Sequence, residues 1–157
     1  MGEHETNRAA PSPTAEALWG DPISVYTREQ AIEDGVLVDV TDWAGTGPDG
    51  MLGGFTVPVA ITRTLWTVLD IDPHDGEPPV IDWRTRVRKR GESTRGRAHD
   101  VLWLAAVAGR RSPTADRVRY AVLMTVAGPA GRPRRIRVLV EARIDGDGVT
   151  IGIPGDF

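Results

Sequence analysis

Three acidic residues, Glu33, Asp34 and Asp39, crowd the short stretch YTREQAIEDGVLVDV from Tyr26 to Val40. Closely spaced carboxylates can bind a divalent cation or act together as a general acid and base. Glu33 and Asp34 are expected near the C-terminal end of a short helix, where the helix dipole does not favour acids, and this placement hints at a role. Because no nuclease motif surrounds them, we treat the three as a candidate acidic surface rather than as metal ligands.

A histidine and an aspartate are neighbours at His99 and Asp100. Such a pair could form a relay, but successive residues of a helix point about 100° apart, so we do not expect these two side chains to meet. His99 together with Asp39 and Asp42 supports a third hypothesis for the function, a small metal-dependent hydrolase or nuclease.

A second cluster lies in the loop sequence DIDPHDGEPP, where His74 accompanies Asp72, Asp75 and Glu77. Their oxygen atoms could bind a hard cation. The cluster has neither the twelve-residue EF-hand pattern nor the HExxH spacing of a zinc site. A solvated loop rich in turn-forming residues is therefore the favoured interpretation.

Other catalytic signals are missing. The chain has no cysteine, which excludes disulfide bonds, thiolate metal sites and a cysteine nucleophile. None of its four serines lies in a nucleophile elbow, and no glycine-rich phosphate loop with a Walker lysine is present. We therefore expect no catalytic residue, metal or cofactor, and the sequence leans away from an enzyme.

The strongest positive charge lies in the basic run RTRVRKRGESTRGR, Arg84 to Arg97. It could contact nucleic-acid phosphates, with Trp83 as a stacking platform. The alternative is an exposed loop that pairs with the acidic half of the chain. The candidate nucleic-acid contacts are the basic side chains at its start, namely Arg84, Arg86, Arg88, Lys89 and Arg90.

Charge is divided between the two halves of the chain. Residues 1–83 carry 15 acids and 3 arginines, whereas residues 84–157 carry 16 basic residues and 7 acids. This asymmetry indicates either a charged partner surface or two halves that neutralise each other, and we favour the second. Arginine outnumbers lysine 18 to 1, a composition typical of a GC-rich genome, which weakens arginine density as a sign of nucleic-acid binding.

The N-terminal elements can be read from their capping residues. Residues 1–21 lack an apolar period and are expected to be a disordered tail, followed by one domain over residues 22–157. Thr27 and Gln30 have the spacing of a capping box, and Gly35 can end the short helix in a left-handed conformation. Val36 to Val40 then forms a strand.

Longer elements follow. Five glycines force a loop over Ala44 to Gly54, and Thr62 can cap a helix that extends to Leu69. Gly96 to Arg110 is the best helix of the chain because its apolar and small residues recur at helical spacing. Three tryptophans are expected as core or hinge anchors, namely Trp43, Trp66 and Trp103.

The last third alternates apolar and polar residues in three successive strands joined by tight turns. This pattern predicts an antiparallel meander with outward-facing arginines and with the long helix on its other face. The expected fold class is therefore α+β in two layers. The sequence has no membrane-spanning run and no signal peptide at its N-terminus, so we expect a cytoplasmic protein.

Three stretches together resemble a family of small uncharacterised proteins of actinobacteria and other bacteria, their phages and plasmids. They are YTREQAIEDGVLVDV, the segment PVAITRTLW, and HDVLWLAAVAGRR followed by GDGVTIGIPGDF. The resemblance implies an accessory protein of mobile elements and assigns no catalytic residue. The loop Gly45 to Gly54 and the basic run depart from the family pattern.

We expect a non-enzymatic interaction or modulator protein that binds an unknown protein partner. A nucleic-acid-binding module is the alternative, and the hydrolase or nuclease comes third. The motivation is the lack of catalytic motifs combined with the divided charge.

Overall fold

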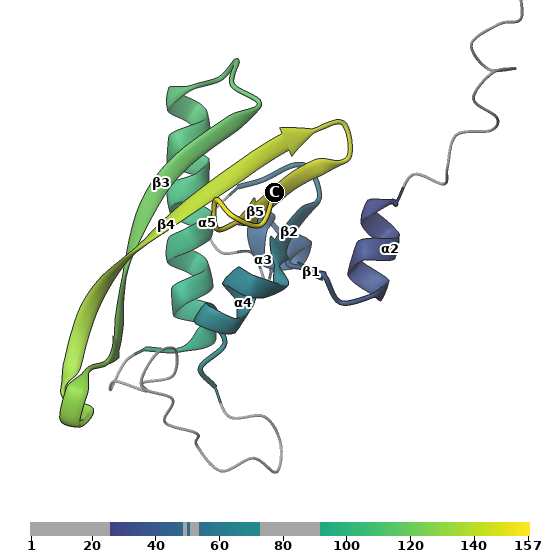
Figure 1. Ribbon diagram of the computed structural model, residues 1–157. Helices are drawn as coiled ribbons and strands as arrows, with labels where there is room; N and C mark the ends of the chain where they lie inside the picture. The colour runs from purple at the N-terminus through teal and green to yellow at the C-terminus, as the bar shows by residue number, and fades with distance from the viewer. Residues whose placement is uncertain (1–25, 49, 51–53, 73–91) are drawn as a thin grey trace, which may run out of the picture.

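The computed structural model describes residues 26–48, 50, 54–72 and 92–157 of the chain. The elements in chain order are α2 (Arg28–Glu33), β1 (Leu37–Asp39), α3 (Thr41–Ala44), β2 (Val59–Thr62), α4 (Arg63–Leu69), α5 (Thr94–Arg111), β3 (Arg117–Ala127), the 3-10 helix η1 (Pro129–Gly131), β4 (Pro133–Asp145) and β5 (Gly148–Gly152). The fold is α+β, as predicted (Figure 1). The predicted tail, the His74 cluster except Asp72, and the basic residues Arg84–Arg90 lie outside the described residues.

One five-stranded sheet runs through the molecule in the order β1-β2-β5-β4-β3. The predicted meander of β3, β4 and β5 is confirmed, because both of its pairings are antiparallel. The parallel pairing of β2 with β5 was not predicted. It joins segments about ninety residues apart, and short apolar strands carry no sequence signal that specifies such a distant neighbour.

The N-terminal unit forms as its capping residues predict. Thr27 accepts a hydrogen bond from the Gln30 amide at 3.2 Å, and the Gln30 side chain accepts one from the Thr27 amide at 2.9 Å. Gly35 adopts a φ of 71°, a conformation that strongly favours glycine. This turn directs the chain from α2 into the edge strand β1.

Two further helices begin at hydroxyl caps. Thr62 accepts from the Leu65 amide at the start of α4, as predicted, and Ser93 accepts from the Gly96 amide at the start of α5. Helix α5 is 18 residues long and begins two residues before the predicted Gly96. Its small buried residues, such as Ala98 and Ala105, let it lie close to β3.

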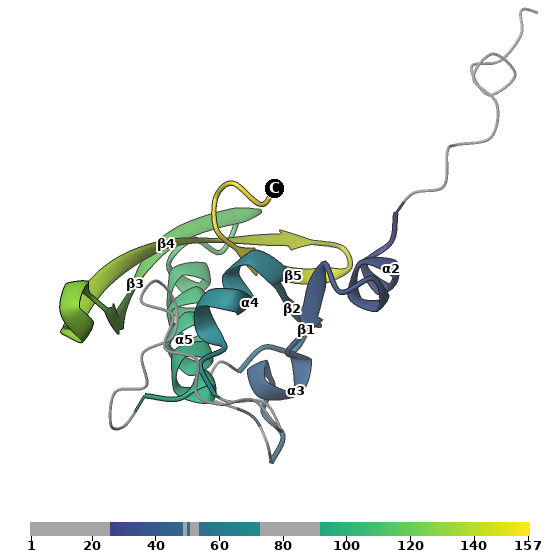
Figure 2. The same cartoon turned by 60° about the horizontal axis from the view of Figure 1, so that its bottom comes forward.

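The core fills the space between the sheet and the helices. Buried side chains from α4, α5 and all strands except the edge strand β1 meet there, including Leu65, Leu102, Val122 and Ile151. Helices α3 and α5 lie on one side of the sheet, and the C-terminal segment after β5 lies on the other (Figure 2). No helix in the described part of the chain is long and apolar enough to cross a membrane.

The three tryptophans expected as anchors differ in how deeply they are buried. Trp43 and Trp66 are half-buried against the core, with ring centroids 5.9 Å apart, as expected of anchors. The expectation for Trp103 is wrong, because this side chain is 41% exposed. Position 103 lies about half a helical turn from Val101 and Ala105, on the side of α5 that faces away from the sheet.

Candidate interaction surface

The surface of β3 and β4 that faces away from α5 is rich in arginine. Side chains alternate along a strand, so Val118, Tyr120 and Val122 face α5 while the residues between them face outward. The antiparallel register sets these outward residues beside their counterparts on β4. We call this surface the arginine face, formed by Arg117, Arg119, Leu123, Arg135, Arg137 and Leu139.

All six side chains of the arginine face are exposed. Leu123 is 63% and Leu139 48% exposed, although both are large apolar residues. The guanidinium groups of Arg117, Arg135 and Arg137 have no ion-pair partner among the described residues. The arginine face thus combines exposed leucines with arginines that have no ion-pair partner among the described residues. These exposed side chains do not contribute to the packing of the core, and such a surface is typical of an interaction site.

A buried carboxylate marks the border of the arginine face. Glu141 accepts a hydrogen bond from Arg143 Nε at 2.8 Å and one from Arg119 Nε at 2.6 Å. Its side chain is fully covered, although the two arginines that bond to it are themselves partly exposed. The hydrogen bond from Arg143, followed by that from Arg119, lowers the pKa of Glu141 below its ordinary value of 4.5. Glu141 is therefore a carboxylate that holds two arginines in place.

The C-terminal segment covers the other half of the same sheet surface. Asp156 accepts hydrogen bonds from the Thr62 hydroxyl and from the Ile153 amide. The Phe157 ring lies 4.3 Å from the guanidinium carbon of Arg143. Figures 1 and 2 show this segment beside β5, and Phe157 reaches the end of β4 that pairs with β5. The arginine face is thus the part of the surface that the C-terminal segment leaves open.

Among the described residues, the acidic half of the chain does not neutralise the arginine face. The ion pairs that reach the arginine face both involve Glu141, which belongs to the basic half of the chain. No acid of the described N-terminal half pairs with Arg117, Arg135 or Arg137. The described acids of the N-terminal half therefore do not neutralise these three arginines, and mutual neutralisation of the two halves stays a prediction. The reason is topological: β3 lies at the opposite edge of the sheet from β1.

The basic run that was predicted to contact nucleic acid enters the described structure only at its end. Arg97 is 4% exposed, and its guanidinium donates to the carbonyls of Val68 and Thr125 and to Glu92. Arg97 therefore ties α5 to α4 and β3 and cannot contact nucleic acid. Arg95 lies over the Trp43 ring, 5.7 Å from its centroid.

The predicted acidic residues lie near one another in sequence but make separate local bonds. Asp34 accepts from the Tyr26 hydroxyl at 2.9 Å, which raises the pKa of Tyr26. Asp39 accepts from the amide and the hydroxyl of Thr41, at 2.9 and 2.6 Å. Glu33 is exposed. Asp39 thus has a structural role that was not predicted from the sequence: it stabilises the turn from β1 into α3.

His99 and Asp100 do meet, contrary to our expectation. His99 Nδ1 lies 3.3 Å from Asp100 Oδ1. Both side chains are short and flexible enough at χ1 and χ2 to turn toward each other across the helix surface. Among the described residues, no group of three or more histidine or acidic side chains could hold a metal ion.

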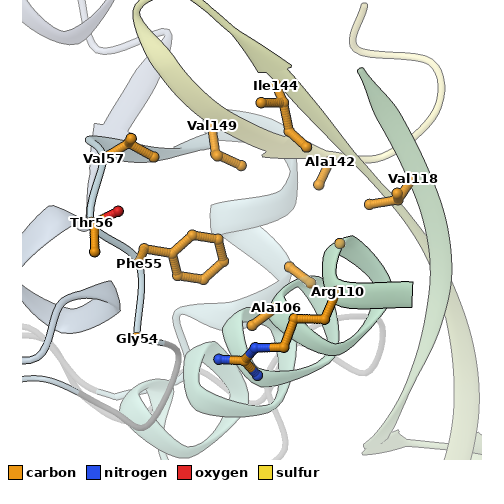
Figure 3. Close-up of a pocket in the computed structure, with 12 residues that line it drawn as sticks. Gly54, Phe55, Thr56, Val57, Ala106, Arg110, Val118, Ala142, Ile144 and Val149 are labelled. Carbon is orange, nitrogen blue, oxygen red and sulfur yellow. The ribbon is translucent and has the colours of Figure 1, made fainter. Parts of the chain in front are cut away.

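A small apolar pocket lies on the opposite side of the sheet, between α5, β4, β5 and the segment before β2. Its volume is 220 Å³, and its lining includes Phe55, Val57, Ala106 and Ile144, with Arg110 at its edge (Figure 3). Ligand pockets usually measure about 300–1,000 Å³. This hollow is therefore smaller than a typical ligand site, and we do not take it as the functional site.

Comparison with known proteins identifies a family but no activity. Residues 18–129 match the family described as "Family of unknown function (DUF6573)". Neither a curated protein nor a solved structure matches the chain.

Proposed function

The chain belongs to the DUF6573 family of unknown function, and from its own surface we propose that it is a non-enzymatic interaction protein whose arginine face binds a protein partner. The observation that carries this proposal is the arginine face itself, where three guanidinium groups without an ion-pair partner in the described part of the chain surround two exposed leucines. The resemblance of the sequence to proteins of bacteria and mobile elements supports an accessory role.

The chemistry of the arginine face favours a protein over a single-stranded nucleic acid. Protein interfaces are enriched in arginine and have an apolar centre. Leu123 and Leu139 could supply such a centre, with Arg117, Arg119, Arg135 and Arg137 around them. Single-stranded nucleic acids are usually bound by stacking on aromatic rings. The arginine face has no aromatic side chain, so the partner surface we propose is acidic with apolar side chains among its carboxylates.

Photo-cross-linking in the native host tests the proposal. A photoreactive amino acid replaces Leu139 at the centre of the arginine face or, as the matched control, Val57 on the opposite side, which is similarly exposed at 43%. The Leu139 position should give a discrete protein adduct, and that adduct should disappear when Arg135→Glu and Arg137→Glu are added. An adduct from Val57 and none from Leu139 would contradict the proposal.

Nucleic-acid binding is the second candidate, and it is favoured by the position of Glu92, which follows the basic run in the sequence. In the sequence, the basic residues Arg84–Arg90 end two positions before Glu92, and Glu92 lines a groove together with Leu123 of the arginine face. A phosphate backbone could therefore extend from the arginine face to the basic run.

This candidate predicts a salt-dependent shift of labelled single-stranded or duplex DNA or RNA. The shift should disappear when Arg86, Arg88 and Arg90 become alanine, because each lost phosphate contact lowers both the affinity and its salt dependence. A nucleic acid bound in this way, with no protein adduct at Leu139, would favour the second candidate over the first.

A further inference from the structure

We propose that the partner binds by strand addition: an extended segment with alternating acidic and apolar residues pairs with the outer edge of β3 between Arg117 and Leu123. This inference rests on the proposed function and specifies how the partner of the arginine face is held. Strand addition is a common way for an extended segment to bind at a sheet edge.

The hydrogen bonds at the two ends of β3 show which main-chain groups face the edge. Asp116 accepts from the Ile144 amide, and the Gly128 amide donates to Arg132, so both even-numbered positions bond toward β4. The register between them is continuous from Arg117 to Ala127. Because antiparallel bonding alternates along a strand, the odd-numbered residues direct their amides and carbonyls outward.

One outward group is already occupied. The carbonyl of Thr125 accepts from the buried Arg97 guanidinium, which confirms the direction and covers this end of the edge. No described group bonds to the outward amides and carbonyls of Arg117, Arg119, Ala121 and Leu123. In the described part of the chain, seven residues of β3 thus form an open edge, and proteins usually cover, charge or shorten such edges.

The open edge lies beside a groove on α5. This groove has a volume of 220 Å³ and is lined by residues of both elements, including Gly96, Asp100 and Leu123. Tyr120 donates to the Val101 carbonyl at 3.0 Å, so α5 runs antiparallel to β3 along this edge. Leu104 and Val107 follow Asp100 at helical spacing and are partly buried. An added strand would therefore meet His99 and Asp100 of α5 near Leu123, and Leu104 and Val107 further along the helix.

The two sides of the open edge determine the chemistry of the segment that fits it. Side chains on one face of the added strand would lie next to Arg117 and Arg119 on the arginine face, where carboxylates are favoured. Side chains on the other face would point toward Leu104 and Val107, where apolar residues are favoured. A strand that alternates acidic and apolar residues meets both requirements at once.

Amide hydrogen exchange, read residue by residue by NMR, tests the inference. The probe is an octapeptide of alternating glutamate and valine. The outward amides of residues 117, 119, 121 and 123 should exchange rapidly in the protein alone and become protected when the peptide is added. The even-numbered amides 118, 120 and 122, which bond to β4, should be protected in both states and serve as the internal control.

Two peptide controls and one protein variant sharpen the test. A lysine–valine octapeptide and a peptide with four glutamates followed by four valines should protect the outward amides far less. Ala121→Pro removes one outward amide without removing a bond to β4, and it should weaken binding of the glutamate–valine peptide about tenfold. Methylation of the amides along one edge of the peptide should abolish binding, and methylation along the other edge should not.

Several outcomes would overturn the inference. Protection of the outward amides in the protein alone would show that the edge is already occupied. The occupant would be a second copy if the protection rises with protein concentration, and another part of the same chain if it does not. Loss of peptide binding in the Arg135→Glu, Arg137→Glu variant without edge protection in the wild type would leave the proposed function standing and reject strand addition. If the partner cross-linked at Leu139 neither binds through the arginines nor protects the edge, both proposals fail.

Discussion

At the scale of single residues, Glu141 is the most informative position. It alternates with the buried residues Val140 and Ala142 along β4, and it lies on the outward side of that strand. Yet it is fully buried, because Arg119 and Arg143 close over it. The alternation of apolar and polar residues indicates the side of the strand on which Glu141 lies. It does not indicate that neighbouring side chains bury the carboxylate.

The lowered pKa of Glu141 makes the stability of the fold depend on pH. The folded-state pKa lies below 4.5, so the stabilisation is complete above about pH 4.5 and is lost as the pH falls through the lowered pKa. Glu141→Gln should therefore unfold at a lower temperature than the wild type at pH 7, and the difference should shrink below pH 4.5. Thermal unfolding followed by circular dichroism from pH 2.5 to 7 measures this. A difference that stays constant over that range would show that the two hydrogen bonds do not depend on the charge of Glu141.

At the scale of elements, capping and periodicity made most of the fold predictable. Thr27, Thr62 and Gly35 act as predicted, and the three C-terminal strands pair as predicted. The pairing of β2 with β5 and the fold of the C-terminal segment were not predicted, because both depend on contacts between distant residues. The sequence therefore predicts that arginines lie on one face of the strands. It does not predict that the other described elements leave this face uncovered.

The C-terminal segment packs closely where it leaves β5, and glycine is required there. A Cβ at Gly152 would lie 2.6 Å from Thr62 and 2.9 Å from Asp156, whereas a Cβ at Gly155 would meet nothing within 4 Å. Gly152→Ala should therefore lower the free energy of unfolding by about 1–3 kcal/mol, and Gly155→Ala should change it by less than about 0.5 kcal/mol. Urea unfolding of both variants measures this. Equal effects of the two substitutions would contradict the described packing.

At the scale of the whole molecule, charge and topology together place the arginine face away from the acidic elements. Helix α2 and strand β1 lie at one side of the sheet, and the β3–β4 ribbon lies at the other (Figure 1). Within the described residues, this separation places the arginines that have no ion-pair partner there at the side away from α2 and β1. If the proposed acidic partner binds there, this positive surface should speed its association and make the association depend on salt.

The most direct test of the arginine face measures the affinity of the partner cross-linked at Leu139 for two variants of equal charge. One carries Arg135→Glu and Arg137→Glu on the arginine face. The other carries Arg134→Glu, which points to the opposite side of β4, and Arg111→Glu at the end of α5. The first should bind at least about tenfold more weakly than the wild type, and the second within about twofold. Equal weakening of both, or of neither, would contradict the claim that the arginine face is the contact surface.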